Sequence, residues 1–240
     1  MKLKNPFARL SGFELGLWIT SITIVAGSFL LAGEYDPLAL AAPLTGVTAL
    51  IFVARGEPTG QALTIAFSLL YALISWRSRY YGEMITYLGM TAPSAVAALI
   101  VWLKHPYKPG GSQENAAPQV VVSHLTSKKL AVTLLLTAAV TAVFYFILRA
   151  FNTAQLAVST VSVTTSFLAS SLMILRSPLY ALAYAANDIV LIVLWILASM
   201  ENISSLPMVF CFAAFLANDI YGFINWRRIR KAQSRSKDQP

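Results

Sequence analysis

The chain has 240 residues, of which 57% are hydrophobic and only 12% are charged, and its mean hydropathy is +0.66. Soluble domains carry about 25% charged residues, so the composition excludes a soluble globular protein and favours a polytopic membrane protein. The net charge of +8 does not indicate a nucleic-acid partner, because the basic residues flank apolar segments and form no patch with aromatic residues. The single cysteine, Cys211, lies in an apolar run, which excludes a disulfide framework.

Basic residues precede an apolar run near the N-terminus, as they do in a signal peptide. Lys2, Lys4 and Arg9 lead into a run from about 15 to 32. This run is longer than the 7–15 apolar residues of a signal peptide, and no A-x-A cleavage site follows it. The segment therefore predicts a first membrane helix, with a cleaved signal peptide as the alternative.

Eight apolar runs are long enough to cross a hydrocarbon core of about 30 Å as helices. Short connections with Gly, Pro, Asn or charge separate them, and one longer polar linker spans 104–128. The chain is therefore expected to be an all-α polytopic membrane protein with eight transmembrane helices. The expected helices are 12–33, 37–54, 59–77, 81–103, 129–149, 155–175, 178–199 and 206–227.

The basic residues orient these helices. With the N-terminus inside, fifteen Lys and Arg residues fall on the cytoplasmic side and three, Arg77, Arg79 and Arg149, on the outer side, where Glu34 also falls. Cytoplasmic loops of membrane proteins are enriched in Lys and Arg. The distribution predicts that both termini are cytoplasmic, which requires an even number of spans.

The helices 37–103 and 155–227 look like two copies of one three-helix unit. In each copy the first helix ends at an Arg (Arg55, Arg176), a Pro follows (Pro58, Pro178), and the third helix ends in Trp and a base (Trp102, Trp226). The helix between the copies inverts the chain, so the two units run parallel, and transporters built this way bind substrate at the repeat interface near mid-depth. The alternative is that such residues merely mark ordinary helix ends. The expected divisions are an N-terminal membrane helix (1–36), the first unit (37–104), a cytoplasmic linker and linking helix (105–150), the second unit (151–230) and a basic cytoplasmic tail (231–240).

Two polar pairs, Asn187-Asp188 and Asn218-Asp219, interrupt the last two apolar segments. Asn187 lies 11 residues after Arg176 and Asn218 lies 9 residues before Arg227, which places both about 14–16 Å from the same membrane edge. Charged residues at this depth are costly and usually mark a site that faces a protein interior or a watery cavity. The two pairs therefore predict a binding site in the middle of the membrane.

Residues three and four apart extend these pairs into stripes on four helices, which we expect to converge on one cavity. Tyr and Trp would supply faces for a flat or cationic ring, amides would bind hydroxyls or a carboxamide, and the aspartates would balance a positive ring. The alternatives are helix packing for the serines, a bundle-holding role for the aspartates, and a rim or a gate for Glu83. The stripes are Tyr180, Tyr184, Asn187, Asp188, Leu191 and Trp195; Asn218, Tyr221 and Asn225, with Asp219 and Trp226 beside them; Glu83, Tyr87, Met90 and Ser94; and Ser159, Ser162, Ser166 and Ser170. For Tyr180 and Trp226 the alternative is a place in the aromatic belt at the membrane interface.

No enzyme signature accompanies these stripes. Paired membrane aspartates occur in intramembrane aspartyl proteases, but the sequence contexts of that family are absent. His105 and His124 both lie in the linker, so no metal site is predicted inside the membrane, and no HExxH, P-loop or GxSxG motif is present. No lysine lies mid-membrane for a retinal Schiff base. We expect no catalytic residue and no cofactor, and a non-transporting sensor remains an alternative to a transporter.

Five stretches resemble the PnuC family of vitamin-precursor transporters, and together they cover about 37–230. The stretches are TGVTALIFVARGEPTGQ, YYGEMITYLGMTAP, STVSVTTSFLASS, SPLYALAYAANDIVLIVLWILASMENIS and PMVFCFAAFLANDIYGFINW. The resemblance implies a fold similar to SWEET transporters, with two three-helix bundles, a linking helix and an extra N-terminal helix, assembled as a homotrimer in the bacterial inner membrane. It also implies facilitated diffusion of nicotinamide riboside, an NAD precursor, with trapping by a cytoplasmic kinase. Relatives that carry thiamine or riboflavin are the alternative.

The resemblance carries two amides over to this chain, Asn187 and Asn218. Many members also have a Gln and an Asn in the first unit, where this chain has Leu88 and Ala66, and a Trp near Ala183. We therefore expect hydrogen bonds to substrate from the two amides and stacking from Tyr184, Trp195 and Tyr221, while Asp188 and Asp219 offset a cationic ring. Tyr87 and Glu83 complete the predicted substrate-binding set.

Overall fold

The computed structural model describes residues 6–33, 36–77, 81–107 and 119–236. The predicted topology residues Lys2, Lys4, Glu34, Arg79, Lys108 and Lys237 lie outside these ranges. Eight helical segments among the described residues are long and apolar enough to cross a membrane, which confirms the predicted spans. The first seven agree with the predicted bounds to within two residues, because the polar connections define where each apolar run stops.

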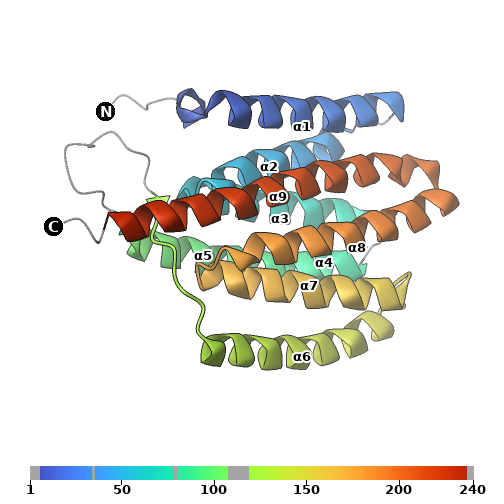
Figure 1. The fold of residues 1–240 in the computed structure, drawn as a ribbon. Coiled ribbons are helices and arrows are strands. Elements are labelled where there is room, and N and C mark those ends of the chain that lie inside the picture. Colours follow the sequence, from blue (N-terminus) through green and yellow to red (C-terminus); the bar gives the residue numbers. More distant parts are fainter. Residues whose placement is uncertain (1–5, 34–35, 78–80, 108–118, 237–240) are drawn as a thin grey trace.

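The helices lie roughly along one common direction (Figure 1). The α-helices are α1 (Gly12–Leu31), α2 (Pro37–Ala54), α3 (Pro58–Arg77), α4 (Tyr81–Thr86), α5 (Ala92–Lys104), α6 (Ser127–Ala150), α7 (Leu156–Ile174), α8 (Leu179–Glu201) and α9 (Leu206–Arg235). A π-helical turn, η2 (Tyr87–Thr91), joins α4 to α5 in a single span. The 3₁₀ turns η1 (Pro6–Arg9) and η3 (Ile203–Ser205) and the two-residue antiparallel strands β1 (Pro106–Tyr107) and β2 (Gln119–Val120) complete the described elements.

Six spans close into a ring. α2 packs against α3 and α9, α3 packs against α5, α5 against α7, α7 against α8, and α8 against α9. The two remaining spans lie outside the ring, α1 against α2 and α9 and α6 against α7 (Figure 1). α1 begins and α9 ends at the same end of this bundle, which we call the terminal end.

The first helices of the two predicted units end in the same way. Gly56 and Arg176 both adopt a left-handed backbone, with φ of 70° and 56°, and Pro58 and Pro178 follow two residues later. In this comparison of the two turns, the position equivalent to Arg176 is Gly56. The sequence had matched Arg176 with Arg55, which is one residue earlier. In both turns the next amide donates back to the helix, from Glu57 to Phe52 and from Ser177 to Leu172, each at 3.0 Å.

Tryptophans tie the two units together at the terminal end. The indole of Trp226 on α9 donates to the carbonyl of Val53 on α2 at 2.9 Å, and the indole of Trp102 on α5 donates to the carbonyl of Met173 on α7 at 3.3 Å. Both indoles are fully buried. Each Trp thus crosses from the third helix of one unit to the first helix of the other, and this exchange supports the two-repeat interpretation.

The second half of the linker crosses the terminal end of the ring. Val120 donates its amide to the carbonyl of Gly56 at 2.9 Å, and Ser123 donates to the carbonyl of Arg176 at 3.0 Å. Gln233 of α9 accepts from the amide of Val122 at 2.8 Å and donates to the carbonyl of Val120 at 3.0 Å. α9 stays helical to Arg235 and so includes the first five residues, 231–235, of the expected basic tail.

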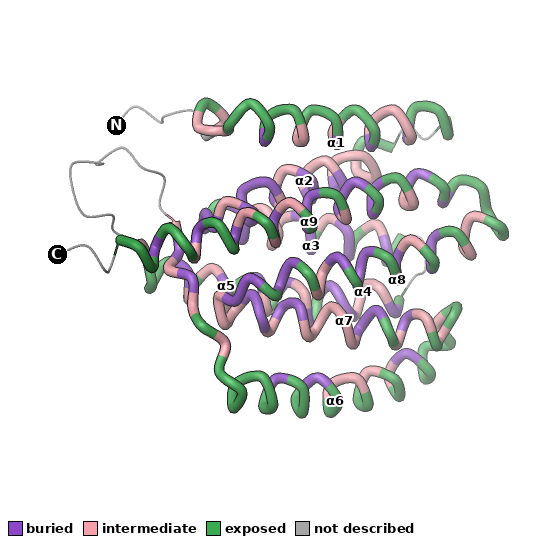
Figure 2. The backbone as a smooth tube through the Cα atoms, viewed as in Figure 1, coloured by how far each residue is buried: buried purple, intermediate pink, exposed green. Residues whose placement is uncertain are grey.

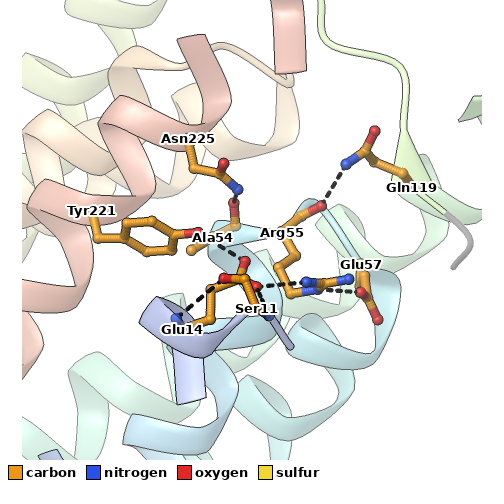
Figure 3. A network of polar contacts seen from close by, with 8 residues as sticks. All are labelled: Ser11, Glu14, Ala54, Arg55, Glu57, Gln119, Tyr221 and Asn225. Carbon is orange, nitrogen blue, oxygen red and sulfur yellow. Dashed lines mark hydrogen bonds and ion pairs between the residues drawn. The ribbon is translucent and has the colours of Figure 1, made fainter. Parts of the chain in front are cut away.

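A buried charge network attaches α1 to the ring (Figure 3). Glu14, which is 4% exposed, pairs with Arg55 at 2.8 Å and accepts from the hydroxyl of Tyr221 at 2.8 Å. Arg55 also pairs with the buried Glu57 at 2.6 Å, and Ser11 caps α1 in a reciprocal bond with Glu14. α1 is therefore held by polar contacts at the terminal end.

The outward faces of α1 and α6 are exposed and apolar (Figure 2). Leu135 and Phe146 on α6 are 72% and 66% exposed, and Phe13 on α1 is 66% exposed. In water such large apolar faces would promote aggregation, whereas lipid tails cover them in a membrane. The surface thus agrees with eight membrane-spanning helices.

Truncation of Glu14 tests the attachment of α1. We expect Glu14→Ala to lower the free energy of unfolding by about 1–3 kcal/mol, because it leaves buried polar partners unsatisfied. The matched control is Arg77→Ala, which removes an exposed 3.8 Å pair with Asp36 and should change stability by about 0–1 kcal/mol. Thermal unfolding in detergent measures both, and equal effects would contradict a special role for the buried network.

Candidate functional site

A cavity of about 70 Å³ lies inside the ring. All six ring spans contribute residues to its wall. Ligand pockets for small organic molecules usually measure about 300–1,000 Å³, so this cavity is small for such a ligand. Its wall comprises Gly46, Ala49, Leu50, Val53, Thr64, Phe67, Tyr87, Thr91, Ser166, Met173, Tyr184, Asn187, Asp188, Leu191, Phe212, Phe215 and Asp219.

The serine stripe of α7 and the polar stripe of α8 meet at this wall. The amide oxygen of Asn187 accepts from the hydroxyls of Thr165 at 2.8 Å and Ser162 at 3.3 Å. Tyr184 shares a hydrogen bond with Ser170 at 2.8 Å. Since the oxygen of Asn187 is engaged on the α7 side, its amide nitrogen is the group left to donate to a ligand.

Asp188 on α8 and Asp219 on α9 form the acidic part of the wall. They are 3% and 4% exposed, and both line the cavity. The second carboxyl oxygen of Asp188, Oδ2, is buried without a hydrogen-bond partner. Neither a Lys, an Arg nor a His lies among the wall residues in the described part of the chain, so the wall has no basic side chain to balance a negative charge.

Aromatic side chains form another part of the wall. The rings of Phe67 and Tyr87 meet edge to face at 5.8 Å, and those of Phe67 and Phe215 at 5.7 Å. Tyr87 begins the π-helical turn η2, a feature often found at functional sites. Gly46 is required here, because a Cβ atom at this position would lie 2.5 Å from the ring of Phe215.

Two predicted contacts, Asn218 and Tyr221, lie outside the cavity and face α1. The amide nitrogen of Asn218 donates to the hydroxyl of Ser21 at 2.9 Å and to the carbonyl of Ala214 at 2.8 Å. Tyr221 belongs to the Glu14 network. The structure therefore does not bring these two side chains together with Asn187, Asp188, Tyr184, Tyr87 and Asp219, which do share the central wall.

The other two, Trp195 and Glu83, lie toward the end of the bundle opposite the terminal end. Both line a second cavity of about 210 Å³, whose wall also includes Tyr81 and Asn152. Trp195 additionally lines a third cavity of about 420 Å³ beside Tyr71. At the terminal end, by contrast, Trp102, Trp226 and Tyr180 form a buried cluster beyond the central cavity.

Sequence reasoning missed two polar residues near the cavity. Thr165 orients Asn187, and its spacing of three from Ser162 was the available signal. Gln61 on α3 is fully buried; its amide nitrogen lies 2.7 Å from the sulfur of Met173, and its oxygen has no partner. Gln61 is the fourth residue of α3. It lies close to the predicted start of this helix, where polar residues are common, so its polarity did not mark it as part of a site.

A ring of six membrane helices around a buried, partly polar cavity is the architecture expected of a polytopic membrane transporter. The model of the nicotinamide mononucleotide transporter family matches residues 36–228. The chain belongs to this family, which contains the PnuC transporters.

Two curated relatives and one solved structure agree with this assignment. The nicotinamide riboside transporter PnuC of Neisseria mucosa is 29% identical over 198 residues, covering 82% of this chain and 74% of the relative. That of Haemophilus influenzae is 24% identical over 195 residues, covering 81% and 80%. The crystal structure of the vitamin B3 transporter PnuC is similar with a TM-score of 0.81, 27% identity and 95% coverage of both chains. The protein is thus a bacterial membrane transporter of this family.

Replacement of Asp219 tests whether the acidic pair serves the cavity or holds the bundle. Asp219→Asn keeps the size of the side chain and removes one buried carboxyl. Because a buried carboxyl costs desolvation free energy, we expect the midpoint of thermal unfolding in detergent to stay unchanged or rise by about 2–4 °C. Glu57→Gln is the matched control, since Glu57 is buried but paired with Arg55, and it should lower the midpoint. A fall of similar size in both variants would show that the Asp pair is structural.

Proposed function

We propose that this protein carries nicotinamide riboside across the bacterial inner membrane by facilitated diffusion. The observation that supports this proposal most directly is the chemistry of the central cavity. Its wall combines a donor amide on Asn187, aromatic rings and two carboxyl groups, with no basic side chain among the wall residues that the structure describes. Nicotinamide riboside has a flat cationic ring, a carboxamide and ribose hydroxyls, and each of these finds a complementary group in such a wall.

The site residues have distinct proposed roles. Asn187 donates to the carboxamide or a hydroxyl, Tyr87 and Tyr184 pack against the ring, and Asp188 and Asp219 offset its positive charge. Trp195 and Glu83 contact the ligand before it reaches the central cavity, in the second cavity of about 210 Å³, through which the ligand enters. Asn218 and Tyr221 support the site indirectly by docking α1.

The absence of basic side chains from the described wall favours the riboside over its phosphorylated form. A phosphate group at this depth would meet two buried carboxyl groups and no Lys or Arg, although phosphate sites normally supply basic groups or exposed backbone amides. The family model is named for the mononucleotide, whereas the two relatives are named for the riboside. The chemistry of this cavity agrees with the relatives.

The proposed orientation places the terminal end in the cytoplasm, and the fifteen basic residues predicted for that side support it. A facilitator only equilibrates its substrate, so net uptake needs a reaction that removes the riboside inside the cell. A separate cytoplasmic kinase, which phosphorylates the riboside, serves this role. The homotrimer implied by the family resemblance is part of the same proposal.

Thiamine is the second candidate substrate, because it also carries a cationic aromatic ring that the Asp188–Asp219 pair would accept. Riboflavin is larger and uncharged, and it therefore gains less from this wall. A sensor that binds without transporting is the alternative outside the transporter class.

Uptake of labelled nicotinamide riboside into proteoliposomes tests the proposal, with unlabelled thiamine, riboflavin and nicotinamide mononucleotide as competitors. We expect saturable uptake that stops when the inside and outside concentrations are equal, with no competition from the mononucleotide. Suppression by thiamine alone would reassign the substrate, and binding without uptake would indicate a sensor.

Truncation of Asn187 tests the cavity itself. We expect Asn187→Ala to weaken riboside binding at least tenfold, or by about 1.4 kcal/mol, because the donor amide is lost while Thr165 and Ser162 can bond elsewhere. Asn218→Ala is the comparison, since this amide lies outside the cavity, and it should leave the Kd within about twofold. Calorimetry on folded variants measures both, and an unchanged Kd for Asn187→Ala would exclude this site.

A further inference from the structure

We propose that the side-chain amide of Gln61 on α3 binds the carboxamide group of the substrate and thereby sets how the ligand lies in the central cavity. This inference rests on the proposed function, because it concerns the same cavity and takes nicotinamide riboside as the ligand. Three features of the structure support it: the direction of the Gln61 side chain, its unsatisfied amide and the flexible side chain that separates it from the cavity.

Gln61 points into the ring. Its amide nitrogen lies 2.7 Å from the sulfur of Met173 on α7, and α5 stands between α3 and α7 in the order of the ring. The contact therefore crosses the inside of the ring instead of joining neighbouring helices. Thr64, which lies on the same face of α3 one turn further along, lines the central cavity. Because α3 begins at the terminal end, Gln61 lies beside the cavity on its terminal side.

The protein leaves the amide of Gln61 poorly satisfied. The side chain is fully buried, and its oxygen, Oε1, has no hydrogen-bond partner among the residues that the structure describes. The partner of its nitrogen is the thioether sulfur of Met173, which is a weak acceptor. A buried polar group without a good partner costs free energy. A ligand that brings both a donor and an acceptor to this point removes that cost.

A primary carboxamide matches both atoms of this amide. It carries an N–H donor and a carbonyl acceptor side by side, as the Gln side chain does. Its N–H therefore donates to Oε1 while its oxygen accepts from Nε2, in a paired arrangement. A hydroxyl has one oxygen and does not span both atoms, and a carboxylate has no donor for Oε1. Among the groups of nicotinamide riboside, the carboxamide is the one that fits Gln61.

The side chain of Met173 lies between Gln61 and the cavity, since it contacts the first and lines the second. Met has three rotatable bonds and adapts its shape to its surroundings. Its backbone is held, because its carbonyl accepts from the indole of Trp102 at 3.3 Å. A rotation of this one side chain therefore uncovers Gln61 and enlarges a cavity that, at about 70 Å³, is small for the ligand.

The depth of Gln61 sets the direction of the ligand. The turns before α3 and α8 correspond, with Pro58 and Pro178 in equivalent places. Gln61 stands three residues after Pro58, and Asn187 stands nine residues after Pro178, so the two amides differ in depth by about 9 Å along the bundle. The riboside carries its carboxamide and its ribose at its two ends. The carboxamide therefore lies at Gln61, nearer the terminal end, and a ribose hydroxyl lies at the donor amide of Asn187.

The test compares two ligands by calorimetry on the unaltered protein and on Gln61→Met. The second ligand is the pyridinium riboside, which keeps the cationic ring and the ribose but has hydrogen in place of the carboxamide. We expect the unaltered protein to bind nicotinamide riboside at least about tenfold more tightly than the pyridinium riboside. In Gln61→Met this preference should fall to within about twofold, because the paired hydrogen bonds are lost, while the Kd of the pyridinium riboside should change by less than about twofold.

Stability separates this role from a structural one. Gln61→Met removes an unsatisfied polar group from the interior, so the midpoint of thermal unfolding in detergent should stay unchanged or rise. The matched control is Gln233→Met. Gln233 is also buried, but both ends of its amide are bonded to the linker, at Val120 and Val122. Its replacement should lower the midpoint and leave the preference between the two ligands unchanged.

The possible outcomes separate this assignment from the proposed function. An unchanged preference for the carboxamide in folded Gln61→Met overturns the assignment and leaves the proposed function intact. If Gln61→Met does not fold, Gln61→Leu takes its place in the same comparison, and failure of both variants to fold shows that Gln61 is structural and overturns the assignment. Absence of riboside binding to the unaltered protein overturns the proposed function itself, and the assignment with it.

Discussion

Carboxyl groups and amides lie at mid-depth in a membrane only where the protein itself encloses them, and the architecture follows from this constraint. The six-helix ring places Asn187, Asp188 and Asp219 on an inner wall, while α1 and α6 present apolar faces outward. Hydroxyl groups of α7 satisfy the amide oxygen of Asn187. The closed ring therefore makes a polar site at this depth possible, because exposure of these groups to lipid would leave them without hydrogen-bond partners.

The two units share their ends but differ in the middle. Their tryptophans and helix-ending turns correspond at the terminal end. At the cavity the correspondence stops: Asn187 stands nine residues after Pro178, and the residue nine positions after Pro58 is Phe67. The contacts that hold the ring together therefore correspond in the two units, whereas the amide and the two carboxyl groups of the cavity wall come from the second unit alone. Such asymmetry suits a ligand with one charged ring and no internal twofold symmetry.

The amino-acid sequence was enough to predict the spans, because a run of about 20 apolar residues is typical of a transmembrane helix and rare in other structures. Of the nine contacts predicted from the sequence, five line the central cavity. The three of these on α8 were predictable because the polar stripe of α8 faces the cavity. The sequence misplaced Asn218 because helical spacing shows which residues share a face but not what that face meets, and α1 meets it here. The packing of Val120 and Val122 into the terminal end was missed because the surrounding segment is polar.

The linker strand has a mechanical consequence. Its amides join Gly56 of the first unit to Arg176 of the second across only four residues, from Val120 to Ser123. Parting the ends of α2 and α7 would break at least one of these bonds, at about 1 kcal/mol for each bond lost. The strand therefore tethers the two helix ends through residues that do not line the central cavity.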